Sequence, residues 1–359
     1  MTAGAATEAQ PEVPDDAWTV VGGGAVGGLL AAALHTAGHP VRIVDTDRAH
    51  VQAIQQRGLV VRGADGTERT ARVPAVHPDD APAELVLKRV LLAVKAQATG
   101  TAVAWIAPRL ADDGFVISAQ NGFGEYTIAE VVGAHRTVGC FINLFADLVE
   151  PGVVSDGGGG TVVLGEIDGT TSPRIVRAVG ELSAWGPVSA SDNVLGHLWS
   201  KLAYTAAAAA GSLTNDPIFE VLERETASTL ALVHEVYQVA LAVGARPASF
   251  DAWEAPFLLP GADPEAARAA LERMCGWLGQ QPKVRTGIWR DLVVRRRPTE
   301  VPALLAPVLA TATEHGLICP GLRALLIVFH DVEAGRKTTG PRTYDPIRAA
   351  VAGPGEELA

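Results

Sequence analysis

The feature that most constrains this chain is a glycine pattern, Gly22-x-Gly24-x-x-Gly27, which lies between the short apolar run of residues 18–21 and an alanine-rich segment. The run predicts a buried strand, and the alanine-rich segment predicts a helix that packs on it. In such a unit the first glycine permits a tight turn. The second lets the backbone approach a pyrophosphate, and the third lets the helix pack closely on the sheet. The pattern therefore predicts a dinucleotide-binding turn, and a glycine-rich turn without a ligand is the alternative.

The helix that follows the turn should contribute to binding as well. Its N-terminus presents free N–H groups and a partial positive charge to any phosphate placed there. We expect the cofactor-binding turn to consist of Gly22, Gly24, Ala25, Val26 and Gly27.

Short apolar runs alternate with helix-compatible segments up to about residue 190. A parallel sheet that is covered on both faces requires strands of this kind. The runs are residues 18–21, 41–44, 90–94 and 115–118. Two added strands are expected at 137–149 and 159–169, joined by Pro151-Gly152 and the flexible run of four glycines at 157–160.

The character of the chain changes after Asn193, where helical periodicity replaces the strand signals. Gly244 and Gly316 follow two of the helical segments, at the position where glycine commonly ends a helix. The predicted fold class is α/β, with an N-terminal Rossmann-type doubly wound domain followed by a C-terminal all-helical domain. The expected divisions are a disordered tail (1–16), the dinucleotide-binding domain (17–192), the helical domain (193–338) and a loosely held C-terminal tail (339–359).

Composition excludes several classes of protein. A net charge of −11 over 359 residues argues against nucleic acid or an anionic membrane as a partner, because both need a basic surface. Cys140, Cys275 and Cys319 are far apart, which fits reduced thiols and no metal site. The N-terminus does not resemble a signal peptide, and the longest apolar stretch, 202–213, is too short to span a bilayer. We therefore expect a cytoplasmic protein.

Asp45 ends the second predicted strand and bears on the choice of cofactor. An acid there accepts hydrogen bonds from the adenosine ribose and repels a 2′-phosphate, which favours NAD over NADP. Arg48 works against this preference, because a guanidinium can hold a phosphate. The alternative for Asp45 is a cap on the helix that starts near Arg48.

Two further loops follow apolar strands, and they place Lys95 and the Asn121-Gly122 pair at the edge of the sheet. Ligands of open α/β sheets bind beyond the carboxyl ends of the strands, so these residues should lie near the nicotinamide end of a cofactor. The alternatives are a solvated lysine and an ordinary tight turn.

In the helical half, Lys201, Thr205, Ala208 and Ser212 share one helix face. A lysine among alanines and leucines needs a partner or a function if it is buried, although it could instead extend to the surface. Further on, Asp291 and Glu300 flank three arginines, a pattern that also fits a solvated helix and loop.

Taken together, these residues resemble the ketopantoate reductase (2-dehydropantoate 2-reductase) family over roughly residues 18–335. The matching segments are VVGGGAVGG, LLAVKAQ, AQNGFGE, LWSKLAY, GIWRDLVVRRRPTEV and HGLICP. The resemblance implies an active site between two domains, where a hydride passes from a reduced nicotinamide to the keto carbon of a 2-oxo acid. It also implies NADPH as the cofactor, a place in pantothenate biosynthesis and a homodimer formed through the helical domain.

The resemblance also assigns roles to single residues. Lys201 matches the family's general acid, and Asn121 matches an asparagine near the nicotinamide and the substrate. Lys95 matches a lysine that contacts the cofactor, and Glu300 matches a glutamate that supports catalysis. A positioned ammonium group suits the reaction, because it stabilises and then protonates the oxygen on which negative charge develops.

Several positions depart from the family's pattern. Thr205 replaces an asparagine one turn after the lysine, and the segment 286–288 lacks an expected serine. Asp45 replaces a basic residue, and the interval from Asp291 to Glu300 is one residue longer than expected. Thr205 and Ser212 are therefore candidate substrate contacts, but 2-dehydropantoate itself does not follow. A reductase of another carbonyl or imine and a non-catalytic dinucleotide sensor stay open, although the presence of Lys201, Asn121 and Glu300 argues against the sensor.

Overall fold

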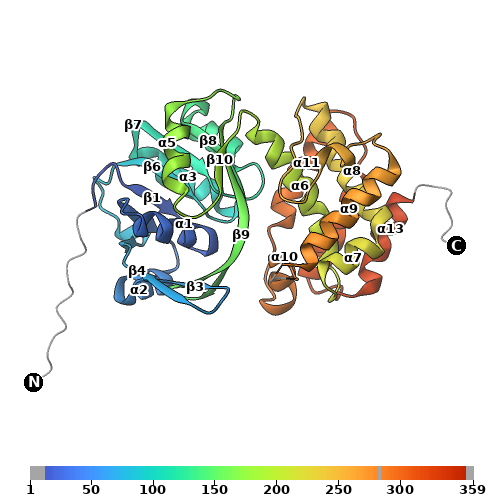
Figure 1. Cartoon of the computed structure of the whole chain (residues 1–359), viewed down its shortest axis with the longest axis horizontal. Coiled ribbons are helices and arrows are strands. Elements are labelled where there is room, and N and C mark those ends of the chain that lie inside the picture. Colours follow the sequence, from blue (N-terminus) through green and yellow to red (C-terminus); the bar gives the residue numbers. More distant parts are fainter. Residues whose placement is uncertain (1–12, 282–283, 353–359) are drawn as a thin grey trace, which may run out of the picture.

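The computed structural model describes residues 13–281 and 284–352. Figure 1 shows a sheet-containing part, blue to green, beside a helical part, yellow to red. The strands are β1 Trp18–Val21, β2 Val41–Val44, β3 Leu59–Gly63, β4 Glu68–Ala71, β5 Ala75–Val76, β6 Leu87–Leu92, β7 Leu110–Ser118, β8 Thr137–Glu150, β9 Val153–Glu166 and β10 Val188–Ala190.

The helices divide between the two parts. Those of the sheet-containing part are α1 Ala25–Thr36, α2 Arg48–Arg57, α3 Thr99–Ile106, α4 Gly124–Val132 and α5 Pro173–Leu182. Those of the helical part are α6 Val194–Gly211, α7 Ile218–Arg224, α8 Thr226–Ala242, α9 Pro264–Gly279, α10 Gly287–Trp289, α11 Val301–Glu314, α12 Pro320–Glu333 and α13 Asp345–Val351. Short 3₁₀ segments are η1 Pro78–Asp80, η2 Ala96–Ala98, η3 Ala107–Arg109, η4 Ala134–Arg136, η5 Ala255–Leu258 and η7 Pro341–Tyr344, and η6 Arg290–Val294 is a π-helical turn.

The strands of the described residues form one sheet in the order β4-β3-β9-β8-β7-β6-β1-β2-β5, with β10 paired to β9. From β8 to β5 every neighbouring pair is parallel, and β9 runs antiparallel to β8. The chain order reverses direction between β1 and β6, as in a doubly wound sheet, and ligands bind at such a reversal. The predicted fold class, a doubly wound α/β domain followed by a helical domain, is confirmed.

Helices cover both faces of this sheet. One face packs against apolar residues of α1, α2 and α5, and the other against those of α3 and α4. All four residues of β1 are buried, so none of its positions faces solvent. The continuous apolar runs of the sequence follow from this double cover.

The helical part is built around α6, which is buried along most of its length. Its alanines, among them Ala203, Ala206 and Ala210, are fully buried and allow close approach of α8. A helix that is apolar all round belongs in a core. Among the helices of residues 13–281 and 284–352, none is both long and apolar enough to cross a membrane.

The glycine run at 157–160 lies inside β9 rather than in a loop between strands, so that expectation was wrong. Gly158, Gly159 and Gly160 adopt positive φ angles of 70°, 69° and 112°, and the register with β8 shifts between Leu144 and Ala146. Glycine is needed here because other side chains rarely adopt such angles. The run therefore forms an irregularity within one long strand, and Pro151-Gly152 alone makes the turn.

The expected tails are also corrected. Residues 1–12 lie outside the described residues, but the Arg42 guanidinium donates to the Val13 and Pro14 carbonyls and Arg89 donates to Asp16. At the other end, η7 and α13 bury Tyr344 and Ile347 in the helical core. These apolar side chains hold the segment in place, although it is rich in proline and charge. At this end of the chain, residues 353–359 lie outside the described residues.

Candidate functional site

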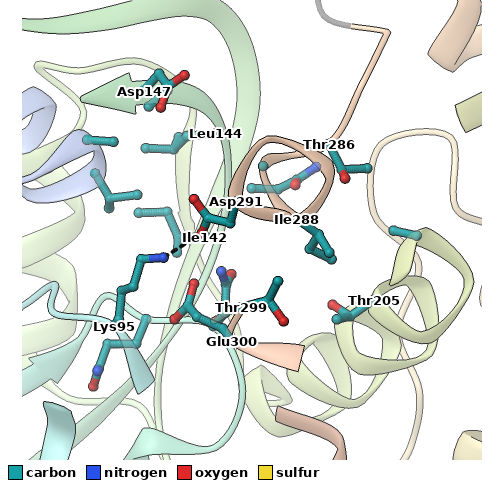
Figure 2. A pocket seen from close by; sticks show the side chains of 18 of the residues that line it. Lys95, Ile142, Leu144, Asp147, Thr205, Thr286, Ile288, Asp291, Thr299 and Glu300 are labelled. Carbon is teal, nitrogen blue, oxygen red and sulfur yellow. Dashed lines mark hydrogen bonds and ion pairs between the residues drawn. The ribbon is translucent and has the colours of Figure 1, made fainter. Parts of the chain in front are cut away.

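A cleft of about 530 Å³ lies between the two parts of the molecule. Its walls on one side come from the carboxyl ends of β1, β6 and β7 and from the middle of β8. On the other side they come from α6, from the segment 285–291 and from the start of α11. Figure 2 shows Lys95 from the sheet side of this cleft, Glu300 from the helical part beside it, and Thr205 and Thr286 farther across the cleft.

The glycine turn stands at the mouth of this cleft and has the geometry that its pattern predicts. Gly22 has φ +96°, and a Cβ at Gly27 would overlap the Gly22 carbonyl oxygen. A Cβ at Gly24 would meet nothing within 4 Å, and no side chain caps the N-terminus of α1. The uncapped amides therefore face open space. This is the arrangement that a pyrophosphate needs, so the residues present fit a dinucleotide.

Asp45 lies beside this turn and does not cap α2. Its carboxylate accepts hydrogen bonds from Gly23 N (2.7 Å) and Asp47 N (2.8 Å), and Asp47 itself caps α2. Arg48 points to Asp79 (3.2 Å) and Asp80 (2.8 Å). The surroundings of the Asp45 carboxylate are thus acidic, and the Arg48 guanidinium forms exposed ion pairs with two acids.

Lys95 follows β6 and reaches across the cleft. Its Nζ donates to the Asp291 carboxylate at 2.7 Å, and Asp291 also accepts from Arg295 (3.1 Å) and Arg297 (2.9 Å). Burial raises the pKa of Asp291, but these three cations outweigh it and hold the pKa below its ordinary value. Asp147 of β8 joins the same network through Arg290 and Arg295.

Asn121 lies after β7 and lines the cleft, while Gly122 does not. Gly122 has φ +84°, and a Cβ there would approach the Leu304 side chain of α11 at 2.6 Å. A positive φ is thus not the only reason for glycine here: Gly122 lets the loop after β7 approach α11 of the helical part closely. Gln120 ties the loop after β7 to the loop after β6, because its side-chain amide donates to Val94 O and to Thr99 Oγ1, both at 2.8 Å.

Lys201 reaches the cleft from α6, although its side chain is only 9% exposed. Its ammonium group lies 5.4 Å from the centroid of the Phe141 ring. No hydrogen-bond acceptor for it is found within residues 13–281 and 284–352. Burial lowers the pKa of Lys201 to about 8, although the Glu300 and Asp251 carboxylates act in the opposite direction. A buried, unpartnered cation of this kind is costly unless it serves a ligand.

Glu300 immediately precedes α11, and its carboxylate accepts a 3.0 Å hydrogen bond from Ala96 N. It therefore connects the loop after β6 to the helical part, one residue beyond Lys95. The cleft brings Lys95, Asn121, Lys201 and Glu300 together from four separate parts of the sequence.

The two candidate substrate contacts lie in different surroundings. Thr205 lines the cleft, and its hydroxyl donates to Lys201 O at 2.7 Å. Ser212 does not line it: the side chain is buried and its hydroxyl contacts Ala208 O and Thr286 Oγ1, both at 2.6 Å. Thr286 does line the cleft, so Ser212 would act on a ligand only through Thr286.

Three polar residues were missed in the sequence: Asp147, which lines the cleft, and His50 and Asp251, which do not line it. Asp147 lies in an apolar strand, His50 lies on a surface-like helix, and Asp251 lies in a loop with φ +44°. Asp251 accepts hydrogen bonds from Asn143 and Thr161 of the sheet, both at 2.6 Å. These contacts join residues about 90 to 150 positions apart, so no local pattern could have revealed them.

Comparison with known proteins identifies the family of this chain. The model of the family "Ketopantoate reductase PanE/ApbA" matches residues 18–169, and its C-terminal counterpart matches residues 193–337. A 2-dehydropantoate 2-reductase of Mesorhizobium japonicum is 29% identical over 238 residues, which are 60% of this chain and 68% of that protein.

Solved structures agree with the fold. The ketopantoate reductase from Ralstonia eutropha JMP134 has a TM-score of 0.73 and 25% identity, and the match covers 89% of this chain and 99% of that one. A D-mandelate dehydrogenase in complex with NADH and anilino(oxo)acetate has a TM-score of 0.74 at 20% identity, with the same coverage. At that identity the likeness shows the fold alone. With both halves matched in order, the chain belongs to the ketopantoate reductase PanE/ApbA family and is an NAD(P)-dependent oxidoreductase.

Proposed function

We propose that this protein reduces the keto carbon of a 2-oxo acid, 2-dehydropantoate or a related compound, and that Lys201 is the general acid. The observation that carries the proposal is Lys201, a residue only 9% exposed, which lines the cleft and whose ammonium group has no hydrogen-bond acceptor in the described residues. An ammonium group held in this way stabilises negative charge on a carbonyl oxygen and then protonates it.

The cofactor end of the cleft is assigned to the glycine turn. The amides of Gly24, Ala25 and Val26 would hold the pyrophosphate, and Lys95 and Asn121 would lie near the nicotinamide. When bound, the reduced nicotinamide supplies a hydride to the keto carbon. Lys95 must then share its ammonium group between Asp291 and the ligand.

Three residues of this chain have separate roles around the reacting carbonyl. Lys201 delivers the proton from its ammonium group, and Glu300 favours the protonated lysine through its negative charge. Asn121 adds an amide donor on the sheet side of the cleft. Desolvation of Lys201 brings its pKa near the working pH, where general acids are most effective.

The two walls around the proposed substrate position combine a few hydroxyls with apolar side chains. Thr205 and Thr286 supply the hydroxyls, while Ile142, Leu144 and Ile288 supply apolar surface (Figure 2). This lining suits a 2-oxo acid with an apolar side chain. It departs from the asparagine and serine expected in the family, which is why the proposal extends to relatives of 2-dehydropantoate.

For the cofactor we propose NADH, used at least comparably to NADPH. Asp45, Asp47, Asp79 and Asp80 make the ribose end acidic, and Arg48 is held by two of these acids. A 2′-phosphate would meet like charge there.

An absorbance assay at the reduced-nicotinamide band tests the proposal. Purified protein is mixed with NADH or NADPH and a panel of 2-oxo acids with side chains of increasing apolar size, 2-dehydropantoate included. Oxidation of the cofactor with at least one 2-oxo acid is expected. Cofactor binding without oxidation by any 2-oxo acid, carbonyl or imine compound would instead support a dinucleotide sensor.

A further inference from the structure

His50 is a buried imidazole that the proposed chemistry does not use. It lies on α2 with 1% of its surface exposed, behind the glycine turn. Its Nδ1 accepts a 2.9 Å hydrogen bond from Gly152 N, and its Nε2 lies 2.9 Å from the Gly23 carbonyl oxygen. A backbone N–H can only donate, so Nδ1 must be the acceptor. Nε2 therefore carries the proton and donates it to Gly23 O.

The hydrogen bond from His50 Nε2 to Gly23 O determines the direction of the Gly24 N–H. Gly23 C=O and Gly24 N–H belong to the same planar trans peptide, and they point in opposite directions. When His50 holds the carbonyl from behind, the Gly24 N–H is directed away from α2. Gly24 lines the cleft, and its N–H has no acceptor within the described residues.

The turn needs such external support because its own residues supply little stiffness. Glycine loses more conformational freedom on folding than any other residue. Asp45 holds the Gly23 N–H on one side, and His50 holds the Gly23 carbonyl on the other. A Cβ at Gly23 would lie 2.6 Å from Ile43 and 3.4 Å from His50 Nε2, so this close approach also requires glycine.

We propose that His50 is a positioning residue for dinucleotide binding: its Nε2–H orients the Gly23–Gly24 peptide so that the Gly24 amide is aimed at the cofactor phosphates. Through Nδ1 it also ties the turn to Gly152, which joins β8 to β9. The inference rests on NAD(P) binding at the turn and does not depend on the identity of the substrate.

Two matched variants separate the two bonds. Gln can place its amide N–H where Nε2 stands, so His50→Gln keeps the donor to Gly23. Asn can place its amide oxygen where Nδ1 stands, so His50→Asn keeps the acceptor for Gly152 and loses the donor. Loss of one neutral hydrogen bond corresponds to a change of roughly three- to tenfold in an equilibrium constant.

The readouts are the NADH dissociation constant from calorimetry and amide hydrogen exchange of the ligand-free protein. For His50→Asn we expect the constant to rise by roughly three- to tenfold and exchange to accelerate in residues 22–28. For His50→Gln we expect the dissociation constant and the exchange rates to stay within about twofold of those of the natural protein. Equal constants for all three proteins, or equal weakening in both variants, would overturn the inference.

A measurement on the natural protein keeps the inference testable if a variant fails to fold. Nitrogen NMR of the ligand-free protein should show His50 as the neutral Nε2–H tautomer. Detection of the Nδ1–H tautomer or of a doubly protonated ring would contradict the inferred bond. If no 2-oxo acid is reduced, these binding measurements can still be made. Failure of the proposed reaction is therefore distinguishable from failure of the inference about His50.

Discussion

Lys95 Nζ and the Asp291 carboxylate meet at 2.7 Å across the cleft and join the α/β domain to the helical domain. The Asp291 side chain is 9% exposed and also accepts from Arg295 and Arg297, so three cations share one buried acid, although Arg295 also pairs with Asp147. Removal of Asp291 leaves these cations close together and without their shared acceptor.

We expect Asp291→Ala to lower the free energy of unfolding by about 1–3 kcal/mol at pH 7, since it removes charge-assisted hydrogen bonds from a largely buried carboxylate. Urea unfolding measures the effect. Because the pKa of Asp291 is depressed in the folded protein, its contribution is present above the pKa of the unfolded chain. It is lost as the pH falls through the folded value. Asp331→Asn, at a surface cluster with Arg336 and Lys337, is the control and should change little.

Gly24→Val should leave the fold intact and abolish dinucleotide binding. A side chain at Gly24 has open space in the free protein but would occupy the position of the pyrophosphate. Circular dichroism should stay native while calorimetry shows no heat with NADH. The matched variant Gly27→Val should fail to fold, because its Cβ would overlap the Gly22 carbonyl oxygen. Native affinity in Gly24→Val would show that the turn has only a structural role.

Asp45→Asn should shift the ratio of kcat/KM for the two cofactors toward NADPH. Removing one negative charge from a partly solvated site beside the ribose is worth about 1–3 kcal/mol, or roughly ten- to a hundredfold. Steady-state kinetics with both cofactors measure the ratio. An unchanged ratio would place Asp45 outside the cofactor site, and a strong NADPH preference in the natural protein would refute the choice of NADH.

Ile347→Ala should destabilise the protein by about 2–5 kcal/mol, although it lies close to the C-terminus. Ile347 is fully buried in the helical core, and Arg348 beside it pairs with Glu225 at 2.6 Å. Thermal unfolding compares this variant with Ile327→Ala, whose side chain is 55% exposed. Equal midpoints for the two variants would mean that α13 contributes nothing to the core.

The elements that the sequence predicts well are those whose neighbours impose a regular pattern. The strands at 18–21 and 41–44 match β1 and β2 residue for residue, because both are covered on two faces. Gly244 and Gly316 have positive φ angles just beyond α8 and α11, as a helix-ending glycine requires. In these segments local chemistry and tertiary packing point to the same structure.

Where packing overrides local composition, the sequence misleads. The glycine run at 157–160 has a loop composition but is held in β9 by pairing with β8. Residues 341–351 are polar on average, yet two side chains anchor them in the core. Motifs predicted Lys201 and Asn121, which both line the cleft, whereas no local pattern pointed to His50 and Asp147, because their contacts lie far away in the chain.

The rate of 2-oxo acid reduction by Lys201→Ala, measured with saturating NADH at pH 7, tests the account most directly. Loss of a general acid predicts a fall of at least about a hundredfold, with the NADH dissociation constant nearly unchanged. In the natural protein the rate should decline as the pH rises through about 8, where burial has placed the pKa of this lysine. Near-normal turnover in a folded Lys201→Ala protein would contradict the account.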